Sequence, residues 1–261
     1  APASGAASPT LDLSLRGGPA EVDEIVGLLP SSLFPRREGM SSSGTLRLEG
    51  VVRGPATDAD FRIDLALENG RIQDPALPQP VEGIVLRLSA DPESVQVSEF
   101  AARVGESALR ARATLFDYQR VPQFLVAADL EADLGAVAGF YAPPDSLELS
   151  GRATAQVIAE GRADRPDAVR FSGTARLAGV RAAGPNLPAP LEGLQGTVLF
   201  IEQTANLEDL RGRLGGSDFA LSGVIRNLAA LRPPARGPDG AVAAAAGRAR
   251  MDLQLRSRRL D

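Results

Sequence analysis

Apolar and polar residues alternate along most of this chain, and this period of two constrains its fold more than any other feature. The alternation is clear in residues 11–15, 62–67, 84–88, 109–115 and 124–130. Successive side chains of a β-strand point to opposite faces of its sheet, so each run predicts a strand with one buried face. The sequence therefore predicts an all-β protein with minor α.

Segments with turn or helix chemistry separate these runs. Asn69-Gly70 predicts a hairpin turn because both residues tolerate positive φ, and Asp91–Ser94 has a proline where a type I turn requires it. Residues 19–29 and 134–141 carry apolar residues at helical spacing and predict short amphipathic helices. Glycines within or beside the strand-like runs predict bends; they are Gly50, Gly54, Gly173 and Gly223.

An internal repeat is visible in the sequence. Leu77–Ile84 (LPQPVEGI) recurs 110 residues later as Leu187–Leu194 (LPAPLEGL), and Phe61 meets Phe171 at the same offset. A unit of several antiparallel strands and one short helix cannot cover its own apolar face, whereas stacked units share a continuous one. We therefore expect tandem antiparallel β-repeat units that form a curled, groove-like sheet, shaped as a trough, with short amphipathic helices.

The repeat predicts a division of the chain. The segments are a linker at 1–9, the end of an upstream repeat unit (strand plus short helix) at 10–35, repeat unit 1 at 36–149, repeat unit 2 at 150–230, a flexible Pro/Gly/Ala loop at 231–246, and the start of the next strand at 247–261. Because this division begins and ends inside a repeat, we expect the chain to be a fragment of a longer one.

The composition argues against several classes of function. Without cysteine or histidine the chain has no disulfide, no thiolate or imidazole metal ligand and no Ser-His-Asp triad. A net charge of −5 argues against wholesale nucleic-acid binding. Carboxylate pairs such as Asp58 with Asp60, or Glu202 with Asp209, would suit glycoside hydrolysis, but solvated loop charges are the favoured interpretation. We expect no enzymatic activity, no catalytic residues, no metal and no cofactor.

Four strings resemble the AsmA-like C-terminal region of AsmA/TamB-type bacterial envelope proteins. They are Leu28-Leu29-Pro30, Ser43–Gly50 (SGTLRLEG), Asn69–Ile72 (NGRI) and Leu77–Val81 (LPQPV). The resemblance covers about Leu11 to Ala230, although the second copy has Gly179 and Val180 in place of the Asn-Gly pair.

The resemblance implies a periplasmic β-structure that curls into an open trough with an apolar interior. The full-length protein would be anchored in the inner membrane by a segment absent from this chain. Its implied function is phospholipid transport and outer-membrane assembly, its implied partners are phospholipid acyl chains and other envelope proteins, and the family has no catalytic residues to carry over.

A lipid groove needs a long apolar surface with no polar groups pointing into it. Each acyl CH₂ removed from water gains about 0.8 kcal/mol, so a chain can be held without specific contacts. The alternative is a structural or adhesive β-repeat scaffold with a closed core and no ligand. The expected groove lining is Leu46, Leu48, Ile63, Leu65, Leu67, Ile84, Leu86, Leu88, Val95, Val97, Ala111, Ala113, Leu115, Val126, Ala128, Leu130, Ala155, Val157, Phe171, Ala175, Leu177, Val198, Phe200, Phe219, Leu221 and Ile225.

Overall fold

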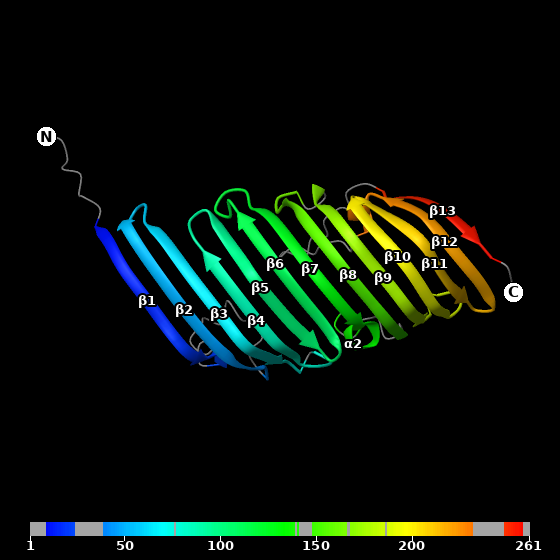
Figure 1. The fold of residues 1–261 in the computed structure, drawn as a ribbon, viewed down its shortest axis with the longest axis horizontal. Coiled ribbons are helices and arrows are strands. Elements are labelled where there is room, and N and C mark those ends of the chain that lie inside the picture. The colour runs from blue at the N-terminus through cyan, green and yellow to red at the C-terminus, as the bar shows by residue number, and fades with distance from the viewer. Residues whose placement is uncertain are drawn as a thin grey trace.

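The computed structural model describes residues 9–23, 39–75, 77–138, 140, 148–165, 168–185, 187–231 and 248–257. They form one antiparallel sheet of thirteen strands, in which every strand pairs with its neighbours in the chain (Figure 1). The strands are β1 (Thr10–Glu21), β2 (Ser41–Pro55), β3 (Asp60–Gln73), β4 (Val81–Ala90), β5 (Ser94–Val104), β6 (Ser107–Phe116), β7 (Gln123–Asp133), β8 (Glu148–Arg162), β9 (Arg170–Ala183), β10 (Leu191–Glu202), β11 (Thr204–Leu214), β12 (Ser217–Arg226) and β13 (Arg250–Arg256). The helical elements are α2 (Leu134–Ala138) and the 3₁₀ helix η3 (Leu228–Leu231).

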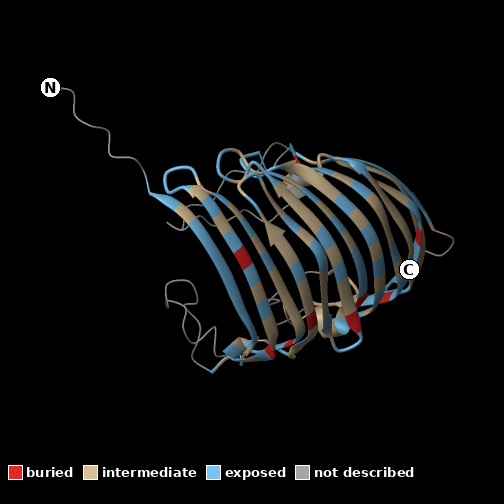
Figure 2. Ribbon diagram, turned by 60° about the vertical axis from the view of Figure 1, so that its left-hand side comes forward, coloured by how far each residue is buried: buried red, intermediate tan, exposed pale blue. Residues whose placement is uncertain are grey.

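The all-β prediction is confirmed, but the strongly curled trough is not. β1 and β13 lie at opposite ends of the strand order, so the sheet is not closed, and it is not strongly curled (Figure 2). Among the predicted bends, Gly50 has an ordinary backbone conformation and Gly54 is the penultimate residue of β2. Gly173 and Gly223, with φ of 147° and 154°, do lie inside strands. Other glycines inside strands also have positive φ, among them Gly44, Gly151 and Gly196. Positive φ at strand glycines therefore does not by itself roll this sheet into a trough.

The predicted hairpin at Asn69-Gly70 is wrong. β3 continues through both residues to Gln73, and its register with β4 shifts between Leu67 and Gly70. Asn69 has a φ of 54°, so its left-handed backbone belongs to a β-bulge inside a strand. Bulges and tight hairpins both use positive φ, so the dipeptide alone does not distinguish them.

The turn predicted at Asp91–Ser94 joins β4 to β5. The Asp91 N–H donates to the Ser94 carbonyl at 3.0 Å, and Asp91 Oδ1 accepts from the N–H groups of Glu93 and Ser94 at 2.9 and 2.7 Å. A side chain that accepts from nearby backbone N–H groups stabilises a tight turn. Tyr118, from the β6–β7 connection, adds a 2.8 Å hydrogen bond to the Asp91 carbonyl.

One predicted helix is present in part. α2 begins at Leu134, as expected, and Asp133 Oδ1 accepts from the N–H groups of Gly135 and Ala136 at its first turn. The other helix, predicted at residues 19–29, is wrong at its start, because Pro19 lies within β1. Residues 24–38 and 141–147 lie outside the described residues, as do 1–8 and 232–247 of the predicted linker and loop.

Two groups of five strands share a common backbone plan. β3, β5 and β6 begin and end 110 residues before β9, β11 and β12, and β2 stands 107 residues before β8. The bulge in residues 67–70 recurs in residues 177–180. Gly83 and Gly193 share φ values of 60° and 61°. We call β2–β6 the first half and β8–β12 the second half.

The described residues contain no conventional hydrophobic core. None of their large side chains is fully buried, and most strand residues are half-buried or exposed (Figure 2). A single sheet has no interior between layers, so its side chains are shielded mainly by neighbours on the same face. The buried apolar residues are Ile84, Ala132, Val169, Val180, Ala205 and Leu210.

Candidate functional site

The strand register gathers the apolar side chains on one face of the sheet, which we call the apolar face. Residues directly opposite each other in an antiparallel ladder point to the same side, so a row can be traced from strand to strand. One row, from β1 to β13, is Ala20, Leu46, Leu67, Leu86, Phe100, Ala111, Ala128, Val157, Gly173, Phe200, Ala205, Ile225 and Met251. No member of the row is polar. With about 4.8 Å between strands, it extends about 58 Å.

The predicted lining residues all lie on the apolar face. Leu48 is opposite Leu65, and Leu65 is opposite Leu88, which forms a second row beside the first. On β8 and β9 this second row continues through Ala159 and Phe171, and Ala155 lies opposite Ala175 on the other side of the first row. The face is therefore continuous across both halves of the sheet.

Several large residues of the apolar face were absent from the predicted lining. Phe100 and Leu210 were missed because each follows a bulge, at Val97/Phe100 and Leu207/Leu210, that moves the alternation by one residue. Phe124 and Leu109 lie in regular alternation, opposite Leu115 and Leu130, and the period alone would have found them.

Most of the apolar face is not covered by another described helix or strand. Apart from neighbouring strands, the extensive contacts among described elements are those of α2 with β7 and β8. Exposure is greatest at the two ends of the sheet, where Leu15 is 58% exposed and Leu255 is 66% exposed. A contiguous apolar surface of this extent, when it is open to water, usually marks a place of interaction.

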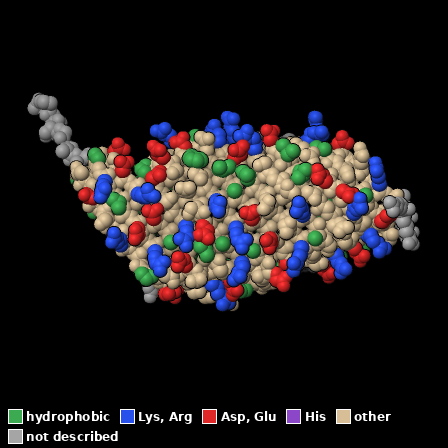
Figure 3. Space-filling model, viewed as in Figure 1, with side chains coloured by type: hydrophobic (Ala, Val, Ile, Leu, Met, Phe, Trp, Pro, Cys, Tyr) green, Lys and Arg blue, Asp and Glu red, His purple; other side chains and the backbone are tan. Residues whose placement is uncertain are grey.

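The opposite face, which we call the polar face, carries ion pairs between neighbouring strands. Glu68 contacts Arg47 at 3.4 Å and Arg87 at 3.7 Å, and Arg87 contacts Glu99 at 2.9 Å. Figure 3 shows positive and negative side chains interspersed over this side of the sheet. Exposed ion pairs contribute only about 0–1 kcal/mol each to stability. Their main effect is to keep this face of the sheet solvated.

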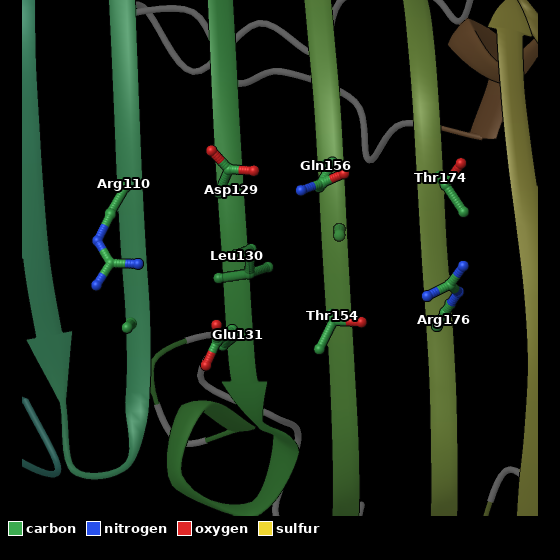
Figure 4. Close-up of a pocket in the computed structure, with 10 residues that line it drawn as sticks. Arg110, Asp129, Leu130, Glu131, Thr154, Gln156, Thr174 and Arg176 are labelled. Atoms are coloured by element: carbon green, nitrogen blue, oxygen red, sulfur yellow. The ribbon is translucent and has the colours of Figure 1, made fainter.

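A shallow recess of about 390 Å³ lies on the polar face over β6–β9 (Figure 4). Arg110 and Arg176 stand on its two flanking strands, while Asp129 and Glu131 project from β7 between them. Two charges of each sign give it neither the net charge of an anion site nor an apolar lining for an acyl chain. The recess therefore behaves as solvated strand surface.

Comparison with known proteins adds nothing to this description of the site. Comparisons with protein-family models, curated proteins and solved structures find no match for the chain. Among the described residues, no cluster of three or more His, Cys, Asp or Glu side chains could hold a metal ion. No helix in the same part of the chain has the length and hydropathy needed to cross a bilayer.

Proposed function

We propose that the apolar face holds phospholipid acyl chains. In this proposal the chain is a periplasmic segment of an AsmA-like protein that contributes to phospholipid transport and outer-membrane assembly. The observation that carries the proposal is the row of apolar residues through all thirteen strands, most of which no other described helix or strand covers. The resemblance of Ser43–Gly50 and Leu77–Val81 to the AsmA-like region adds the cellular setting.

The dimensions and energetics suit an acyl chain lying along the open face. The acyl chain of one leaflet spans about 15 Å, half of a hydrocarbon core of about 30 Å, and the face is several times longer. Each methylene that leaves water contributes about 0.8 kcal/mol. A surface of half-buried Leu, Val and Ala side chains needs no specific polar contact to bind such a chain, and it lets the chain slide along the row.

A substitution that places a charge on the apolar face tests the proposal. Leu65→Asp removes an apolar side chain in the second row and puts a carboxylate where an acyl chain would lie. We expect phospholipid to co-purify with the full chain expressed in a bacterium with two membranes, and to fall at least about fivefold in Leu65→Asp. Native mass spectrometry and lipid extraction measure the bound amount.

Ala66→Asp is the matched control. Ala66 is the next residue in β3 but lies on the polar face, opposite both Arg47 and Arg87, where a carboxylate is favourable. We expect it to retain bound lipid and to fold normally by circular dichroism. A lipid-free, cooperatively folded wild-type chain would contradict the proposal and favour a scaffold without ligand. Lipid retained by a folded Leu65→Asp variant would also contradict it, because the lipid would then bind elsewhere than on the apolar face.

A further inference from the structure

The two end strands of the sheet share a five-residue motif that differs at one position. β1 contains Asp12–Arg16 (DLSLR), and β13 contains Asp252–Arg256 (DLQLR). Both strands run in the same direction, because an even number of antiparallel steps separates them. The two motifs therefore present the same edge and the same faces, with aspartate and arginine on the polar side and leucines on the apolar side.

In β1 the two charges of the motif have partners on β2. Asp12 lies directly opposite Arg53 and forms an ion pair with it at 3.3 Å. Arg16 lies directly opposite Glu49. On the apolar side, Leu15 lies opposite Gly50, and a Cβ at Gly50 would lie 3.7 Å from the Leu15 Cβ. β2 is thus complementary to the motif in charge and in side-chain size.

In β13 neither of the same two charges has an oppositely charged residue directly across from it on β12. Asp252 lies opposite Val224 and Arg256 opposite Ala220 on β12, and neither forms an ion pair within the described part of the chain. The other edge of β13 pairs with no described strand. Leu255, the counterpart of Leu15, is 66% exposed.

We propose that the free edge of β13 is a docking site for a strand of the β2 type. Such a strand would pair as β2 does with β1, placing an arginine opposite Asp252 and a glutamate opposite Arg256. A valine would face Leu253 and a glycine would face Leu255. An exposed sheet edge with unpaired backbone groups is the general route by which an extended segment adds to a sheet.

The related strand β8 should fit this edge less well. Its alignment with β2 at an offset of 107 puts Glu160 opposite Asp252, which is a repulsive pair, and uncharged Gln156 opposite Arg256. It also puts Val157, rather than a glycine, against Leu255. Side-chain complementarity across the new pair therefore selects β2-type strands over β8-type strands. This inference does not depend on lipid binding.

Two peptides of equal length test the site on the full chain. One has residues 43–55 (SGTLRLEGVVRGP) and the other residues 150–162 (SGRATAQVIAEGR). We expect the 43–55 peptide to slow amide hydrogen exchange in residues 250–256 and to bind about tenfold more tightly than the 150–162 peptide, as fluorescence anisotropy would measure. The tenfold ratio follows from the two cross-strand charge positions.

Reversing one charge on β13 should reverse the preference. Asp252→Arg changes an exposed residue at the edge and should weaken the 43–55 peptide, whose Arg53 would face the new arginine. It should strengthen the 150–162 peptide, whose Glu160 would then face an opposite charge. Equal affinity of the two peptides for the wild-type chain, protection outside residues 250–256, or an unchanged preference in Asp252→Arg would overturn the proposal.

Discussion

The two halves of the sheet share a backbone plan but differ in the side chains that it carries. On the apolar face, the first half has the large residues Leu46, Leu48 and Leu65. The second half has Ala153, Ala155 and Ala175 at the corresponding positions. All six are apolar, so the face stays apolar in both halves while the size of its side chains changes. The smaller side chains of the second half extend less far from the strands and leave more space over the sheet.

The polar face differs more strongly between the halves. The ion-pair series formed by Arg47, Glu68, Arg87 and Glu99 has no equivalent in the second half, where the first three positions are Thr154, Ala178 and Thr197. The fourth, Asp209, pairs within its own strand with Arg211 at 2.7 Å. What the halves retain in common is the bulged backbone and one uninterrupted apolar face, which is where we place the function.

The largest expected effect comes from a glycine that only the second half needs. Gly173 occupies the place of Ile63 in the first half, but its φ of 147° is unfavourable for any other residue, and an added Cβ would overlap the Gln156 carbonyl oxygen. We expect Gly173→Ala to lower the free energy of unfolding by about 2–4 kcal/mol, measured by denaturant titration.

Gly50→Ala is the same chemical change with a different local environment. Gly50 has an ordinary backbone conformation, and the nearest heavy atom to its added Cβ lies at 3.6 Å. We expect a change within about 0.5 kcal/mol. If both alanine variants lost the same stability, the different backbone requirements of the two halves would not be the cause.

The strands of this fold could be predicted from residues such as Leu46, Leu65 and Leu67, because a period of two is typical of a strand with one apolar side. The shared face followed from the same alternation. Phe100 could not be assigned from it, because a bulge moved the period by one residue. Asn69 was misassigned because a bulge and a hairpin turn require the same φ.

The curvature of the sheet also escaped prediction, and the reason is different. Glycine permits a bend without requiring one, and Gly50 and Gly173 look alike in sequence although only Gly173 adopts positive φ. The pairing of Asp12 with Arg53 was equally invisible, because it depends on the register between two strands. The sequence therefore predicted properties of single strands, such as their alternation, but not properties that depend on the pairing of two strands.

A smaller effect is expected from the ion pairs that only the first half has. Arg87→Thr installs the residue of the second half and removes contacts to Glu68 and Glu99. We expect a loss of about 0.5–1 kcal/mol at low salt that shrinks in about 1 M salt, where the Debye length is about 3 Å. Arg110→Thr, at a strand position without an ion pair among the described residues, should show little salt dependence. If the loss of stability in Arg87→Thr did not change with salt, packing of the aliphatic part of the Arg87 side chain would contribute more than its ion pairs.

The smallest effect concerns a turn that the halves build differently. Asp91 caps the β4–β5 turn, and the N–H groups of Glu93 and then Ser94 lower the pKa of its carboxyl below 3.8. The second half has Ile201 at the corresponding position and no such carboxylate. Because the folded-state pKa is depressed, the charged cap stabilises the fold above pH 3.8, and this contribution disappears as the pH falls through the folded-state pKa.

Asp91→Asn keeps the shape of the side chain without its charge. The variant should be slightly less stable than wild type at about pH 7, and the two should converge in acid in denaturant titrations. A difference that stays constant with pH would assign the role of Asp91 to its shape alone.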